Sequence, residues 1–146
     1  MKKVMVCVDL SDESIEFFKK SLKAVDWSGI DEVHFVHGFQ KHIYADNFYF
    51  TTFPLETEFA DIEKSVVDVM KTFEAEIYGD KKKPNIVNKC IISNTLKKAM
   101  SEYAKESNVD EMIIATRGHT GIEGLFASSF AEYMLRHAAC NLRILR

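Results

Sequence analysis

The residues best suited to chemistry lie in one glycine-rich segment near the C-terminus, residues 115–129. Three of the six glycines of the chain fall within seven consecutive positions there. Glycine lets a backbone approach a ligand closely, and the unpaired amides at the start of a following helix favour an anion. Ser128 and Ser129 add hydroxyl donors for phosphate oxygens. The segment therefore predicts an anion site with phosphate as its natural ligand.

Charged residues near this segment have two interpretations each. Arg117 and His119 either meet the charge of a bound phosphate or lie in a solvated loop. Asp9 follows the first apolar run and either contacts the ligand or caps the turn that follows it. The sequence leaves these alternatives open.

Apolar periodicity predicts the elements that position these residues. Short apolar runs rich in β-branched residues are typical of buried strands, and apolar residues spaced by three and four are typical of amphipathic helices. The chain alternates between the two patterns. Strands are predicted over residues 4–8, 33–37, 86–92, 111–115 and 142–145, with Gly38 ending the second; helices are predicted from 11 to about 25, over 56–78, from 94 or 95 to about 105, and from 128 or 129 to 137.

Alternating strands and helices predict an α/β fold, a doubly wound five-stranded parallel sheet with helices on both faces. Right-handed crossovers restrict the fold to a doubly wound sandwich, for which 3-2-1-4-5 is the common order of five strands. Ligands of such sheets lie beyond the carboxyl ends of the strands, where the strand order reverses. We therefore expect a site between the turn at residues 9–11 and the loop that follows Ala115.

An aromatic-rich stretch, residues 39–55, interrupts the pattern. Phenylalanines and tyrosines crowd into it without a clean period, and a long loop or lid is predicted. It either packs over the body of the domain or a partner subunit, or covers a ligand.

Composition narrows the class of protein. A chain of 146 residues is expected to form a single domain, residues 1–146, and its net charge of −3 argues against a general nucleic-acid binder. Its first apolar run is too short for a signal peptide or a membrane span. The three cysteines form no CxxC pair, and His34 and His37 are expected on opposite faces of a strand, so no metal site is predicted. The expected location is the cytoplasm, away from membranes.

Enzymatic motifs are absent from the sequence. It contains neither the phosphate-loop pattern GxxxxGK[ST] nor the nucleophile pattern GxSxG. We expect no enzyme and no catalytic residue, and His119 is the one evident base in the segment.

The chain resembles the universal stress protein family. Residues 115–140 carry Arg-Gly-His-Thr-Gly-Ile-Glu-Gly-Leu, Ala-Glu and Leu-Arg-His-Ala-Ala-Cys, which are similar to the C-terminal signature of that family. Residues 8–11, Val-Asp-Leu-Ser, are similar to its first strand and turn. The order of predicted elements matches over the whole chain.

This resemblance implies a stress-response module that binds ATP or AMP, with Mg²⁺ as a companion of ATP. Slow ATP hydrolysis, with His119 as the base, is the most catalysis that we expect. Many members use the pattern Gly, two residues, Gly, nine residues, Gly, then Ser or Thr; here Gly118 and Ser129 match it, whereas Ala115 and Ser128 replace glycines. The nucleotide-binding residues that we expect are Asp9, Gly38, Ala115, Arg117, Gly118, Ser128, Ser129 and Phe130.

The resemblance also implies a homodimer that pairs through the C-terminal strand, with an unknown protein partner for signalling. The alternative function is a dimeric interaction or regulatory protein of the same fold that binds no nucleotide. In that case the aromatic stretch would occupy or replace the ligand site.

Overall fold

A parallel five-stranded sheet forms the centre of the structure, a computed structural model that describes residues 1–10, 12–80, 82–115 and 129–145. The strands follow the order β5-β2-β1-β6-β7, and all four neighbouring pairs are parallel. This arrangement confirms the predicted order 3-2-1-4-5. The strands are β1 (Lys3–Cys7), β2 (Glu32–Gln40), β5 (Asn85–Ser93), β6 (Glu111–Ala115) and β7 (Asn141–Leu145).

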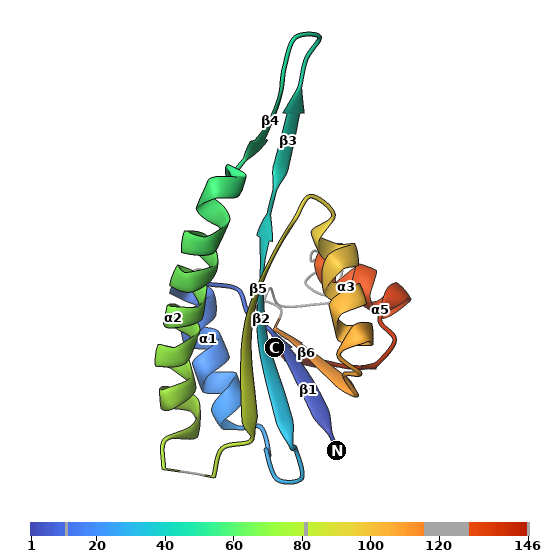
Figure 1. Cartoon of the computed structure of the whole chain (residues 1–146). Helices are drawn as coiled ribbons and strands as arrows, with labels where there is room; N and C mark the ends of the chain where they lie inside the picture. The colour runs from blue at the N-terminus through green and yellow to red at the C-terminus, as the bar shows by residue number, and fades with distance from the viewer. Residues whose placement is uncertain (11, 81, 116–128, 146) are drawn as a thin grey trace.

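Helices cover both faces of this sheet, as predicted (Figure 1). One face packs against α1 (Asp12–Lys23) and α2 (Phe59–Tyr78), and the other against α3 (Leu96–Glu106) and α5 (Ser129–His137). A short 3₁₀ turn, η1 (Glu56–Glu58), precedes α2. The predicted helices are confirmed with ends that differ by a few residues. We call the five strands and these helices the body.

Strand β1 shows why its sequence is apolar without interruption. Val4 and Val6 belong to the cluster under α1 and α2, whereas Met5 and Cys7 belong to the cluster under α3 and α5. Successive side chains of a strand point to opposite faces, so a strand covered on both sides needs apolar residues at every position. Each of these four side chains is buried.

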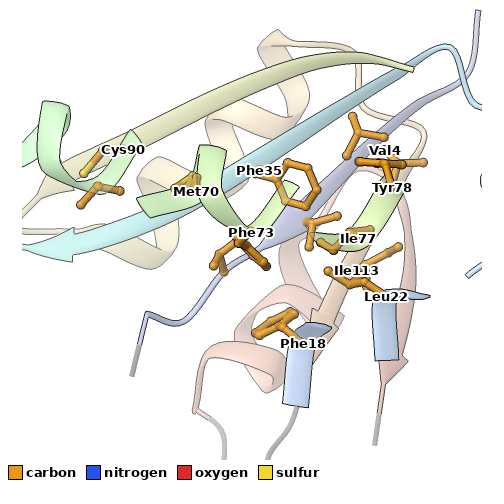
Figure 2. Packing of buried hydrophobic residues seen from close by; sticks show 14 residues of the cluster. Val4, Phe18, Leu22, Phe35, Met70, Phe73, Ile77, Tyr78, Cys90 and Ile113 are labelled. Atoms are coloured by element: carbon orange, nitrogen blue, oxygen red, sulfur yellow. The ribbon is translucent and has the colours of Figure 1, made fainter. Parts of the chain in front are cut away.

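The larger of the two clusters joins the helices to the sheet through aromatic side chains (Figure 2). Phe35 of β2 lies against Phe73 of α2, with ring centroids 5.6 Å apart. Phe18 of α1 is 1% exposed and Ile77 of α2 is 4% exposed. Burial of such side chains contributes about 1.5–3 kcal/mol each, so this interface is a main source of stability.

Polar groups meet at the amino ends of the strands. A carboxylate oxygen of Glu32 lies 2.7 Å from Nε2 of His34 and 3.1 Å from Nζ of Lys3, and its other oxygen accepts a hydrogen bond from Nδ2 of Asn85 at 2.8 Å. These bonds lower the pKa of Glu32 to about 2. Nδ1 of His34 lies 2.8 Å from the hydroxyl oxygen of Tyr103 in α3.

The second strand is longer than predicted. It does not end at Gly38, because β5 continues to pair with β2 through Gly38↔Ile91, Phe39↔Ile92 and Gln40↔Ser93. The prediction was wrong because a glycine was taken as a strand end without knowledge of the neighbouring strand.

The aromatic stretch is also not a loop, and that prediction was wrong. It contains an antiparallel pair, β3 (His42–Ala45) and β4 (Phe50–Phe53), which we call the arm together with the residues up to Leu55. In the turn, Oδ1 of Asp46 accepts hydrogen bonds from the backbone amides of Phe48 and Tyr49 at 2.8 and 2.9 Å. The arm projects from the end of the sheet, away from the body (Figure 1).

Most side chains of the arm are solvated on both faces, so the alternation of apolar and polar residues that reveals a half-buried strand is missing. In the described part of the chain, no helix has the length and apolar character needed to cross a membrane.

Candidate functional site

A cavity of about 250 Å³ lies at the carboxyl ends of β1, β2 and β6. This is the position at which the strand order reverses, where α/β sheets of this kind hold their ligands. Most of its walls are apolar. The lining residues are Cys7, Val8, Asp9, Phe18, His37, Gly38, Leu96, Met100, Ile114, Ala115 and Phe130.

Backbone bonds fix the chain where β1 enters the cavity. The amide of Val8 donates to the carbonyl oxygen of Val36 at 2.9 Å, which extends the pairing of β1 with β2 by one residue. Nδ1 of His37 lies 2.8 Å from the carbonyl oxygen of Val8. Because a carbonyl oxygen only accepts, Nδ1 carries the hydrogen, and Nε2 of the neutral ring is left as an acceptor.

Gly38 lets α3 close over β2. A Cβ atom at this position would lie 2.8 Å from both Cδ1 of Leu96 and Sδ of Met100. These two side chains therefore occupy the space that a side chain of residue 38 would need, and they line the cavity in its place.

Ala115 causes no backbone strain where the family pattern has a glycine. It is the last residue of β6 and pairs with Leu145 of β7 in ordinary extended geometry. Among the described residues, Asn108 alone of the non-glycine residues has a positive φ, 54°. Replacement of that glycine by alanine therefore adds one methyl group and removes no donor.

Phe130 brings the start of α5 to the cavity. It is the second residue of the helix and one of the lining residues. The amides at a helix N-terminus have no partner within the helix and carry a partial positive charge. An anion held at this side of the cavity would meet that charge.

Few described side chains of the cavity can carry charge. Asp9 is exposed at the end of β1, and His37 is half-buried beside it. Burial raises the pKa of the Cys7 thiol far above its usual range, so this sulfur stays protonated and unreactive at neutral pH. The described residues contain no group of three or more metal-ligating side chains.

The structure brings four of the predicted site residues together, namely Asp9, Gly38, Ala115 and Phe130. Arg117, Gly118 and Ser128 lie outside the described residues. Ser129 begins α5, and its side chain lies outside the described part as well.

Sequence reasoning did not assign the other seven lining residues to the site, among them His37, Leu96 and Met100. His37 was considered as a metal ligand and not as part of this site, although its position at the carboxyl end of a predicted strand was a usable signal. Leu96 and Met100 fall within the helix predicted from 94 or 95 to about 105. Nothing in the sequence showed that this helix starts over the cavity.

Comparison with known proteins agrees with this α/β architecture. The sequence profile of the universal stress protein family matches residues 1–146. The chain therefore belongs to the universal stress protein family. A search of curated protein sequences finds no match.

Several solved structures share the fold at low sequence identity. Universal stress protein UspA from Lactobacillus plantarum is 20% identical and has a TM-score of 0.70, with 99% of this chain and 97% of that chain covered. A universal stress protein in complex with cAMP is 15% identical, with a TM-score of 0.63 and coverage of 99% and 96%. A family member from Arabidopsis thaliana with AMP bound is 17% identical, with a TM-score of 0.59 and coverage of 99% and 91%.

Proposed function

We propose that this protein is a stress-response module that binds an adenine nucleotide, ATP or AMP, in the cavity at the carboxyl ends of β1, β2 and β6. The observation that carries this proposal is the cavity itself, which gathers Asp9, Gly38, Ala115 and Phe130 at the reversal of strand order. The AMP and cAMP complexes of two proteins with the same fold support the choice of ligand.

The described walls suit the base of the nucleotide. They are largely apolar, which favours a flat aromatic ring, and their polar groups are few, as in most small-molecule sites. The exocyclic amine of adenine is a donor. The carboxylate of Asp9 is an acceptor that can select such a donor, and Nε2 of His37 is a second one in the tautomer that donates from Nδ1 to Val8.

The phosphates belong at the other side of the cavity, near the start of α5. The N-terminal amides of this helix favour an anion. We assign phosphate contacts to Gly118, Ser128 and Ser129 on the basis of the family pattern and to Arg117 because of its positive charge, with Mg²⁺ accompanying ATP.

We propose a binding module rather than an enzyme. The described lining offers one exposed carboxylate, Asp9, and one imidazole, His37, and its thiol is protonated at neutral pH. We expect the protein in the cytoplasm, where its free cysteines stay reduced. We also expect a homodimer through β7, which lies at one edge of the sheet, and a protein partner for signalling.

Titration calorimetry with AMP, ATP and cAMP tests the nucleotide proposal. We expect binding at micromolar to millimolar concentration, and at least tenfold weaker binding in Asp9→Ala. Asp68→Ala is the matched control, because it removes an exposed carboxylate from α2, far from the lining residues. Absence of both heat and a thermal shift at millimolar AMP and ATP would defeat the proposal.

Mass spectrometry of the denatured protein gives a second readout. Adenine nucleotide released from freshly purified protein would identify the natural ligand directly. Loss of that nucleotide in Asp9→Ala, with retention in Asp68→Ala, is the expected pattern.

A second candidate function is a pure interaction protein. The exposed aromatic side chains of the arm favour it. The arm does not act by filling the cavity, since no residue from 39 to 55 is among the lining residues. A protein that binds no nucleotide but still associates through the arm would establish this function.

A further inference from the structure

The arm exposes far more apolar surface than its size explains. Phe48 is 95% exposed, Phe50 66%, Tyr49 63%, Phe53 62% and Tyr44 56%, and Leu55 and Ile43 are 50% and 44% exposed. With about 200 Å² for a large side chain, these fractions correspond to roughly 800 Å². The largest apolar patch of an ordinary monomer is about 300–600 Å². The arm is therefore a surface that needs a partner.

The arm also lacks support within its own chain. In the described structure it is a separate two-stranded sheet, and β3 and β4 contact mainly each other. An isolated two-stranded hairpin is marginally stable in water and gains stability from further strands or from packing. Its outer strand edges remain available for pairing.

We propose that the arm is a self-association surface that binds the arm of a second copy of this chain, with the two arms side by side and antiparallel. Three observations support a second copy as the occupant. The first is area, since roughly 800 Å² on each copy equals the contribution of one partner to a standard protein interface.

The second observation is charge. Between His42 and Phe53 the only acidic or basic residue besides the histidine is Asp46, and its carboxylate accepts two backbone hydrogen bonds in the turn. At the root, Lys41 lies 3.4 Å from a carboxylate oxygen of Glu56 and over the ring of Phe59. The arm thus offers no free cation to an anionic lipid surface, whereas two copies of so uncharged a surface meet with little repulsion.

The third observation is the distribution of apolar groups over the arm. Residues paired directly across the two strands share a face, and every second residue along a strand lies on the same face. Tyr44 and Phe53 therefore lie on one face, and Ile43 and Phe50 lie on the other. A flat membrane surface would cover one face. A second arm together with the body from which it emerges can cover both.

The root of the arm offers a place for the tip of the second arm. A hollow of about 500 Å³ lies between the arm and α2. Its lining is apolar at Phe39, Phe53, Pro54, Ile62 and Val66 and polar at Glu58, Asp61 and Ser65. In an antiparallel pair of arms, the tip of each arm lies at the root of the other. The proposal therefore places the Phe48–Tyr49 tip of one copy at this hollow of the other copy.

Analytical ultracentrifugation of wild type and Phe48→Asp is the first test. We expect the variant to halve the mass of the assembly and to weaken the association at least tenfold. Phe48 is almost fully exposed, so the substitution leaves the fold intact, which circular dichroism checks. Val69→Glu is the matched control, because it adds one negative charge at another exposed apolar residue, on α2. An unchanged mass in Phe48→Asp, or a monomeric wild type, overturns the proposal.

Cross-linking between two different cysteine variants tests the orientation. Asn47→Cys lies at the tip and Thr57→Cys beyond the root, both exposed, in a Cys140→Ser background that removes the natural cysteine that is not fully buried. A short bismaleimide should join a mixture of the two variants into a cross-linked dimer. The control mixture of Asn47→Cys and Asp68→Cys should give a yield of cross-linked dimer at least fivefold lower. Equal yields, or a tip-to-tip product in excess, overturn the antiparallel arrangement.

Sedimentation with vesicles of phosphatidylcholine and phosphatidylserine separates self-association from lipid binding. Wild type and Phe48→Asp should both remain in the supernatant. Co-sedimentation of the wild type that Phe48→Asp abolishes, without a change in assembly mass, would show that the occupant is a membrane and would overturn the proposal. None of these tests depends on nucleotide binding, so the two proposals fail separately.

Discussion

The body and the arm use the same kinds of residue for opposite purposes. In the body, Phe35 is completely buried between the sheet and α2, where it contacts Phe73. In the arm, Phe48 and Phe50 face solvent on a two-stranded sheet. An aromatic side chain inside the body stabilises the fold, whereas one on the arm leaves its apolar surface for an interaction.

Carboxylates show the same contrast. Glu32 of the body is bonded by His34 of its own strand and also by Lys3 of β1 and Asn85 of β5, two residues that are distant in the sequence. Asp46 of the arm is bonded only by backbone amides of its own turn, which also lower its pKa. The body is held together by contacts distant in sequence, and the arm by local ones.

The largest expected difference between body and arm is in the free energy of unfolding of two variants, Phe35→Ala and Phe48→Ala. Removal of the buried ring should lower the free energy of unfolding by about 3–5 kcal/mol, because it leaves a cavity between β2 and α2. Removal of the exposed ring should change it by less than about 0.5 kcal/mol. Urea unfolding at low protein concentration measures both, and a loss above about 1 kcal/mol in Phe48→Ala would show that the arm supports the body.

An intermediate effect is expected at Gly38, where β2 passes from the body toward the arm. Gly38→Ala should lower the free energy of unfolding by about 1–3 kcal/mol, because the new methyl group meets Leu96 and Met100 at 2.8 Å. Thermal and urea unfolding measure the loss. The double variant Gly38→Ala/Leu96→Ala should lose less than the sum of its single variants. Additive losses would mean that Leu96 does not cause the crowding.

The smallest expected effect concerns pH. The folded-state pKa of Glu32 is about 2, below the ordinary value of about 4.3. The stability that this carboxylate contributes is therefore complete above pH 5 and is lost as the pH falls toward 2. Between pH 7 and pH 3 the free energy of unfolding should fall by about 1 kcal/mol more in the wild type than in Glu32→Gln. This value takes into account that solvent screens part of the interaction.

Urea unfolding at both pH values measures this difference for Glu32→Gln and for Asp46→Asn. The pH dependence of stability in Asp46→Asn should resemble that of the wild type more closely than the pH dependence in Glu32→Gln does. A larger pH effect from Asp46→Asn would contradict the contrast between long-range and local contacts.

The fold of the body could be predicted because its signals are local and consistent. The apolar run at Val4–Val8 and the spacing of Phe59, Ile62, Val66 and Phe73 identify a buried strand and a long helix from a few neighbouring residues. Alternation of such elements and the handedness of crossovers then restrict the strand order. The candidate site followed from the same topology, which correctly brought Asp9 and Ala115 to one cavity.

The parts that could not be predicted depend on residues distant in sequence. The extension of β2 past Gly38 required β5 as a partner, and the cavity wall formed by Leu96 and Met100 required the start of α3 to lie over that glycine. The arm was missed because most of its side chains are exposed on both faces, and hydrophobic periodicity reports only burial.

The sequence by itself thus determined the class of fold, the order of elements and the edge of the sheet where the cavity lies, because hydrophobic periodicity encodes local geometry. Only the tertiary structure decided the shape of the cavity, the hydrogen-bonded state of His37 and the exposure of the aromatic arm. Those properties depend on which surfaces meet in space, and no short window of sequence contains that information.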